Sequence, residues 1–237
     1  MTSLAEQTRQ RLIDAATRGF AEHGVHTASL LEITRQAGQR NRGAVHYHFG
    51  SRMGMVVAVL EQRLENLAAR ERELLEAARA LPDDDLRSAV VALVLPAVEL
   101  AEHGTQGRCY LMILAELVEE DPQAIDAEVV QTLERLGGYE VYGLLEERLP
   151  QMDDDIRAER LSLVTAFILR AIADRSRSGE RPTGRPQLAT EPFAGNLVDM
   201  VVAMLVAPIT PVAPVTPSGP VTPVVSPTGS SAPKLSQ

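Results

Sequence analysis

The sequence lacks several features that would place the protein outside the cytoplasm or in a membrane. It has one cysteine, Cys109, so no internal disulfide can form, and a reducing compartment fits best. No apolar run reaches the roughly 18 residues that a membrane span needs. The N-terminal residues lack the basic and then apolar order of a secretory signal. We therefore expect a cytoplasmic protein with no membrane segment.

Signatures of catalysis and metal binding are also missing. The 237 residues contain no nucleophile–base grouping, no phosphate-binding glycine loop and no metal-ligand spacing. The best metal candidates are His46 and His48, with His23 and His26 as further ligands. An i, i+2 pair on a helix points to different faces, however, so shared ligation is poor. We expect no enzyme, no cofactor and no metal.

Two further features favour a structural role over a chemical one. The acidic runs 83–85 and 153–155 each precede a helical pattern, where acids cap the helix and complement its dipole. Cys109 has only Arg108 as a basic neighbour and no second cysteine to pair with, so we expect a packed thiol and not a redox sensor.

Charge is distributed unevenly along the chain. Residues 1–52 hold seven arginines and four acidic residues, a net charge of +3. The formal charge of the whole chain is −9, so the remainder carries −12. A basic N-terminal segment on an acidic body is compatible with nucleic-acid binding despite the negative total.

No alternating strand pattern occurs, and helical periodicity predicts an all-α fold of about nine helices. Ser3 and Glu6 have capping-box spacing at the start of the first helix, and Gly24 is a good terminator. A second helix begins at Ser29 and ends at Gly38. A short third helix follows, capped by Asn41. Ser51 can cap a long fourth helix that continues to about Arg79.

Further apolar periods predict the rest of the body. The run 90–98 indicates a buried helix with Pro96 inside it, and another helix begins near Arg108. One long helix is predicted from 123 to 145, and two more are centred on 161–172 and 193–205. Between 208 and 223, proline falls at every third position, which is typical of an extended tail. A passive tail is favoured over a ligand for a proline-binding partner.

The stretch "GQRNRGAVHYHFGSR" carries the strongest functional signal. Two short helices joined by a tight turn after a glycine suit a helix-turn-helix, whose later helix enters the major groove. Arginine can bind a guanine edge or a phosphate, and helix starts bind phosphate oxygens. The predicted DNA-contacting residues are Ser29, Gln39, Arg40, Asn41, Arg42, Gly43, His46, Tyr47, His48, Ser51 and Arg52.

"LIDAATRGFAEHGVHTASLLEITRQAG" and "NRGAVHYHFGSR" resemble the TetR family of bacterial transcriptional regulators over roughly residues 5–65. The turn here is one residue longer than usual, with Gln39 and Arg40 in it, and His46 replaces a common tyrosine. The resemblance implies a dimer whose N-terminal domains bind adjacent major grooves of a palindromic double-stranded operator. It also implies a small-molecule site in the C-terminal helices and a dimer interface on the last two helices.

We therefore predict three regions: a helix-turn-helix head (residues 1–52, motif about 29–49), a helical effector-binding and dimerisation body (53–206) and a disordered tail (207–237). The effector is expected to be apolar or amphipathic. Polar and aromatic candidates for its site are Glu99, His103, Arg108, Met112, Tyr139, Tyr142, Phe167 and Arg170. The alternative is a DNA-binding regulator that answers to a protein partner and has no small ligand.

Overall fold

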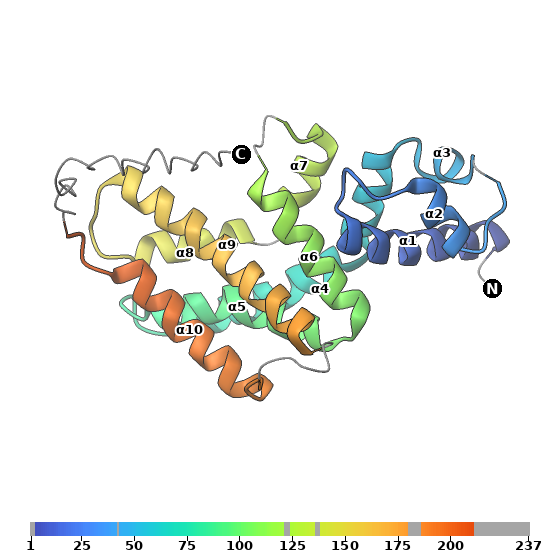
Figure 1. Cartoon of the computed structure of the whole chain (residues 1–237). Coiled ribbons are helices and arrows are strands. Elements are labelled where there is room, and N and C mark those ends of the chain that lie inside the picture. The colour runs from blue at the N-terminus through green and yellow to red at the C-terminus, as the bar shows by residue number, and fades with distance from the viewer. Residues whose placement is uncertain (1–2, 42, 121–123, 136–137, 180–185, 211–237) are drawn as a thin grey trace, which may run out of the picture. The chain divides into compact units, whose positions relative to one another are not determined.

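The computed structural model describes residues 3–41, 43–120, 124–135, 138–179 and 186–210, and these contain ten helices and no strand. The head has three short helices: α1 (Leu4–His23), α2 (Leu30–Gln36) and α3 (Ala44–Phe49) (Figure 1). α4 (Arg52–Arg79) begins against the head and runs into the body. The predicted all-α fold is confirmed.

Capping side chains set the helix starts of the head, as predicted. The Ser3 hydroxyl accepts a hydrogen bond from the Glu6 N–H, and the Ser29 hydroxyl accepts one from the Glu32 N–H. The Ser51 hydroxyl accepts one from the Gly54 N–H at 2.9 Å. Each bond satisfies a donor that the first helical turn leaves unpaired.

A glycine allows α1 and α2 to approach closely. A Cβ added at Gly19 would lie 2.8 Å from the Ile33 side chain, closer than packed carbon atoms tolerate. Phe20 follows directly in the chain and is fully buried. The head core therefore needs a residue without a side chain at position 19.

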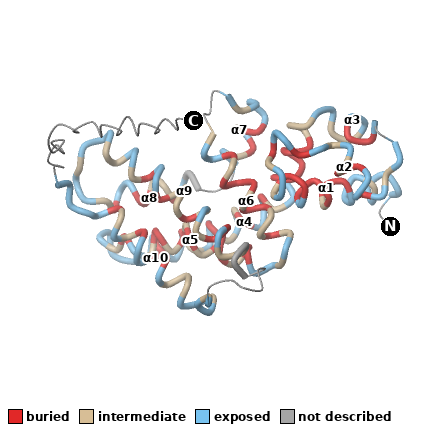
Figure 2. The backbone as a smooth tube through the Cα atoms, in the orientation of Figure 1, coloured by how far each residue is buried: buried red, intermediate tan, exposed pale blue. Residues whose placement is uncertain are grey.

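The body contains six more helices around one hydrophobic core: α5 (Leu86–Glu102), α6 (Thr105–Glu119), α7 (Ala127–Glu134), α8 (Gly138–Arg148), α9 (Asp154–Gly179) and α10 (Thr190–Val206). α4 packs against α5, α7 and α8, and α6 packs against α9. Figure 2 shows buried positions continuing from the head helices along α4 into α5 and α6. α5 continues through Pro96 to Glu102, so the proline does not end it.

The predicted long helix over 123–145 is wrong: the structure has α7 and α8 in its place. α7 ends at Glu134, and α8 begins at Gly138. The glycine pair 137–138 accounts for the interruption, because each glycine inside a helix costs about 1 kcal/mol relative to alanine.

Arg148, at the end of α8, holds the turn between α4 and α5. Its guanidinium is buried and donates to the carbonyls of Ala78, Leu81 and Asp85 and to the Ser88 hydroxyl, at 2.7–3.3 Å. Carbonyls at a helix end have no partner within the helix, so one side chain satisfies several of them at once.

The chain from 208 onward forms a separate unit from residues 1–207. The predicted extended tail falls largely on 211–237, outside the described residues. Within the part of the chain that the structure describes, no helix is both long and apolar enough to cross a membrane.

Candidate DNA-binding surface and effector cavity

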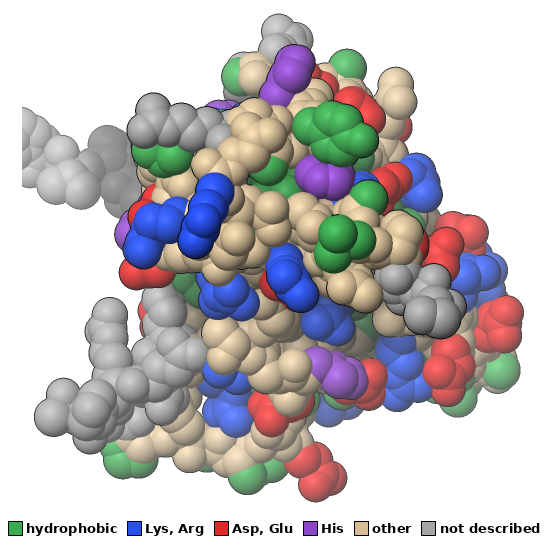
Figure 3. All heavy atoms as spheres, turned by 90° about the vertical axis from the view of Figure 1, so that its right-hand side faces the viewer, with side chains coloured by type: hydrophobic (Ala, Val, Ile, Leu, Met, Phe, Trp, Pro, Cys, Tyr) green, Lys and Arg blue, Asp and Glu red, His purple; other side chains and the backbone are tan. Residues whose placement is uncertain are grey.

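α3 presents a polar face to solvent and an apolar face to the head core. Ala44 and Val45 are buried, whereas His46 and Tyr47 are exposed, Tyr47 to 80%. Figure 3 shows the side of the molecule to which the head belongs, where arginine and histidine side chains lie at the surface. An exposed tyrosine on a short helix is available to a partner surface and contributes little to the fold.

The turn before α3 brings the predicted contacts together. Gln39 is partly exposed, and Arg40, Asn41 and Gly43 are exposed; Arg42 lies outside the described residues. The Asn41 side chain accepts a hydrogen bond from the Gly43 N–H at 2.9 Å. Asn41 was predicted to cap α3, but the residue at the cap position is Gly43, so Asn41 acts in the turn before the helix. The exposed polar groups are thus held on a defined backbone.

Two histidines, His46 and His48, make contacts at the end of α3. The His46 Nδ1 lies 2.7 Å from the Gly50 carbonyl oxygen, which leaves Nε2 on the exposed side chain for another partner. The rings of Tyr47 and His48 meet edge to face with centroids 4.9 Å apart. No group of three metal-binding side chains occurs among the described residues.

Arg52 is turned toward the protein. Its Nη1 donates to the carbonyls of Val25 and Ala28, at 3.0 and 2.8 Å. These carbonyls belong to the turn between α1 and α2, so the first residue of α4 fixes that turn. Its predicted role as a phosphate contact stays a prediction, and this positioning role could not be seen in the sequence.

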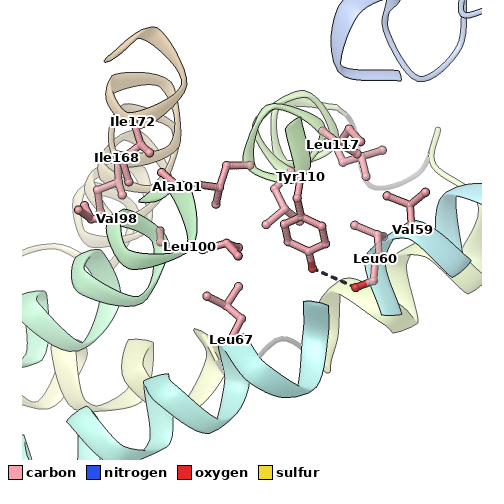
Figure 4. Close-up of a cluster of buried hydrophobic side chains, with 14 of the residues drawn as sticks. Val59, Leu60, Leu67, Val98, Leu100, Ala101, Tyr110, Leu117, Ile168 and Ile172 are labelled. Carbon is pink, nitrogen blue, oxygen red and sulfur yellow. Dashed lines mark hydrogen bonds between the residues drawn. The ribbon is translucent and has the colours of Figure 1, made fainter. Parts of the chain in front are cut away.

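The body contains a cavity of about 530 Å³. Helices α4 to α9 all contribute to its lining, and most of the lining side chains are aliphatic. Figure 4 shows three of them, Leu67, Leu117 and Ile168, which come from α4, α6 and α9. Its size and apolar character are typical of small-molecule sites.

One charged side chain lies buried in the wall of this cavity. Glu71, on α4, is 7% exposed, and its Oε2 has no hydrogen-bond partner. Burial raises the pKa of the Glu71 carboxyl to about 7. The signal was present in the sequence, because Glu71 continues the apolar stripe formed by Leu64, Leu67 and Leu75.

The predicted effector contacts lie in several different places on the body. Tyr142 lines the cavity, and its hydroxyl is hydrogen-bonded to that of Thr165. Glu99 accepts two hydrogen bonds from Arg70 and, with His103, lines a groove between α5 and α10.

Arg108, Met112, Phe167 and Arg170 do not line this cavity. Arg108 lines a further pocket with residues of α5, α9 and α10. Met112 and Phe167 are partly buried and Arg170 is exposed. The Tyr139 side chain lies outside the described residues. Of the predicted set, Tyr142 alone is among the described residues that line the cavity.

α6 contacts both the cavity and the head. Leu114 and Leu117 line the cavity, and Glu116 between them, together with Glu120 just after the helix, reaches the loop between α1 and α2. There the Glu116 carboxylate accepts from the Val25 N–H at 2.8 Å, and Glu120 lies 2.9 Å from the His26 Nε2. Glu120 also lines the cavity, so one side chain touches both regions.

Comparison with known proteins agrees with this arrangement. Residues 12–59 match the pattern described as bacterial regulatory proteins of the tetR family, and residues 91–204 match a tetracyclin repressor-like C-terminal domain. The transcriptional regulator SrpR of Pseudomonas putida is 31% identical over 163 residues, covering 69% of this chain and 71% of SrpR.

Two other similarities extend this result. The transcriptional activator FasR of Mycolicibacterium smegmatis is 31% identical over 120 residues, half of each chain. An alanine-substituted mutant of HlyIIR has the same fold, with a TM-score of 0.55 at 17% identity over 86% of this chain and 98% of that one.

Proposed function

Because the chain belongs to the TetR family, whose members are DNA-binding transcriptional regulators and not enzymes, we propose that it is a cytoplasmic, ligand-responsive repressor. It binds a palindromic operator as a homodimer, and a small molecule in the body releases it. One observation carries the ligand-responsive part: α6 both lines the cavity and contacts the head. The division into head (1–52), body (53–206) and tail (207–237) is part of this proposal.

DNA recognition is assigned to the turn and exposed face of α3. Arg40 and Arg42 precede the helix, and Tyr47 and His46 project from it. Arginine pairs with guanine edges or phosphates, and the polar tips of tyrosine and histidine donate to phosphates or bases. The side-chain caps at Ser29 and Ser51 mark two further helix starts, where backbone N–H groups favour phosphate oxygens.

Dimerisation is assigned to α9 and α10. These helices pack on each other and on α5, yet they leave large apolar side chains exposed, among them Leu163 at 52%, Val206 at 44% and Met200 at 38%. Exposed apolar side chains on adjacent helices favour burial against a second copy. Two heads held at a fixed spacing then match the two halves of a palindrome.

Release follows from the contacts of α6 with the loop between α1 and α2. A ligand that favours one position of α6 also favours one position of the head, through Glu116 on Val25 and Glu120 on His26. α4 gives a second connection, because Arg52 at its start holds the same loop. Ligand and operator then favour different states of one equilibrium.

The test is binding of the full chain to DNA from upstream of its own gene at several salt concentrations, beside Arg40→Ala and Arg42→Ala. Exposed Arg72→Ala in the body is the matched control. We expect tight, salt-dependent binding that both head variants weaken about tenfold or more and that the control retains. Absence of specific binding, both there and after selection from random sequence, would contradict DNA recognition.

The second candidate is control by a protein partner, favoured by the acidic character of the body, which carries most of the chain's negative charge. A thermal-shift screen against metabolites separates the two candidates. A bound effector raises the melting temperature by mass action. A screen with no stabilising compound, followed by capture of a partner that releases the operator, would replace the small-molecule proposal.

A further inference from the structure

The walls of the body cavity carry charge of one sign only. Among the described residues that line it, the acidic side chains are Glu71, Glu120 and Glu134, and no arginine, lysine or histidine is present. Other carboxylates of the body do have arginine partners: Glu99 pairs with Arg70 and Glu61 with Arg135. An apolar cavity whose charged groups are all acidic disfavours an anionic ligand and favours a cationic one.

The three carboxylates differ in their surroundings. Glu120 already contacts His26, and Glu134 is exposed at the end of α7. Glu71 is the one that is buried, and its Oε2 is without a hydrogen-bond partner. Leaving a buried carboxylate oxygen unpaired is costly, so a site that retains one gains most from a ligand that supplies a donor.

We propose that Glu71 is the anchoring residue of the effector site and that it binds the protonated amine of an otherwise apolar molecule. The amine donates to the free carboxylate oxygen, and the aliphatic side chains of α6 and α9 enclose the apolar part. Tyr142 lines the same cavity, and an aromatic ring close to a cation attracts it. This assignment rests on the proposed function, because it names the ligand class of the same cavity.

Proton release on binding gives a second signature of this contact. Burial raises the pKa of Glu71 to about 7, so a fraction of the free protein carries the proton at neutral pH. An ammonium group stabilises the carboxylate and expels that proton. Burial raises the pKa of both Tyr110 on α6 and Tyr142 on α8, and the nearby Glu71 raises it further, so both tyrosines stay protonated in this range. Glu120 and Glu134 line the same cavity.

The experiment compares three molecules of one shape, phenylbutylamine, phenylbutanol and phenylbutyrate, by titration calorimetry with the full chain. We expect the amine to bind about tenfold or more tightly than the alcohol, as a charge-assisted hydrogen bond implies, and the acid to bind most weakly. Amine binding at neutral pH should release protons, seen as a dependence of the measured heat on the buffer's ionisation enthalpy.

Two variants complete the design. Glu71→Gln should reduce the amine's affinity to that of the alcohol, abolish proton release and leave alcohol binding unchanged. Glu65→Gln, on the exposed face of the same helix, is the matched control and should retain both the amine's affinity and the proton release. The proposal is overturned if the amine fails to bind, binds no more tightly than the alcohol, or is insensitive to Glu71→Gln. If the alcohol or acid binds instead and releases the operator, the ligand-responsive repressor stands and the cationic ligand alone is rejected.

Discussion

Head and body are both helical, but the packing of their interiors differs. In the head, Ile33 packs directly on Gly19 and Phe20 is fully buried, and the hollow of about 380 Å³ between α1 and α2 has no buried charged side chain in its lining. The body leaves a cavity of about 530 Å³ and places a buried carboxyl group, Glu71, in its wall. Both buried side-chain oxygens without a hydrogen-bond partner among the described residues, Glu71 Oε2 and Gln106 Oε1, lie in the body. An unpaired buried oxygen reduces stability, so its presence in the wall of the cavity indicates a different task for the body.

The difference fits a rigid DNA-reading unit joined to an adaptable sensor. A DNA-binding surface loses affinity if its side chains must be ordered on binding, so a closed core supports it. A ligand site instead benefits from space that a ligand fills. The loop between α1 and α2 is where the two meet, since Arg52, Glu116 and Glu120 all bind it.

The largest effect is expected from Arg148, which holds the body's α4–α5 turn. Arg148→Met removes the donor of three carbonyls and a hydroxyl and should lower the free energy of unfolding by about 3 kcal/mol or more. Urea unfolding at fixed protein concentration measures it. Arg72→Met, an exposed arginine of α4, should change stability by no more than about 0.5 kcal/mol. If Arg148→Met and Arg72→Met changed the free energy of unfolding equally, Arg148 would not be the residue that stabilises the α4–α5 turn.

The next effect concerns Glu71 and depends on pH. Its folded-state pKa of about 7 lies above the ordinary 4.5, so the folded state binds the proton more tightly. The contribution of this proton to the free energy of unfolding is at its maximum below about pH 4.5 and is lost as pH rises through about 7. Relative to Glu71→Gln, the wild type should lose on the order of 2 kcal/mol between about pH 5 and about pH 8. Unfolding curves across this range check it; parallel pH profiles would show that Glu71 is not desolvated.

A smaller effect separates two roles for Arg52. If it positions the α1–α2 loop, Arg52→Met should lower head stability by about 1 kcal/mol and leave the salt dependence of operator binding unchanged. If it contacts a phosphate, stability should hold and the salt slope should fall by about 1. Thermal unfolding and DNA titrations on the same samples distinguish these outcomes, with Arg40→Met as the reference for a surface arginine.

Features fixed by neighbouring residues could be predicted from the sequence. The starts of α1, α2 and α4 follow from Ser3, Ser29 and Ser51, because each hydroxyl caps an N–H three residues away. The family resemblance of the head also lay in a local pattern, which residues 12–59 confirm.

Features fixed by distant residues could not be predicted. The acceptors of Arg148 lie 60 or more positions away, and His26 meets Glu120 across 94 positions. Periodicity carries no information on such pairs, nor on which apolar side chains leave a cavity between them. The predicted effector contacts combine polar residues with large core residues, and of these Tyr142 alone is among the described residues that line the cavity. Glu71 is visible in the sequence only as a carboxyl group within the apolar stripe of α4.

The central claim is that the cavity and the operator-binding surface are thermodynamically linked. The most direct measurement is the operator dissociation constant of the wild-type protein, with and without a saturating amount of whichever phenylbutyl compound binds most tightly. We predict that the filled cavity weakens operator binding by a factor of about 5–150, and that ligand affinity falls by the same factor in the protein–DNA complex. Identical operator affinity with an occupied and an empty cavity would contradict it.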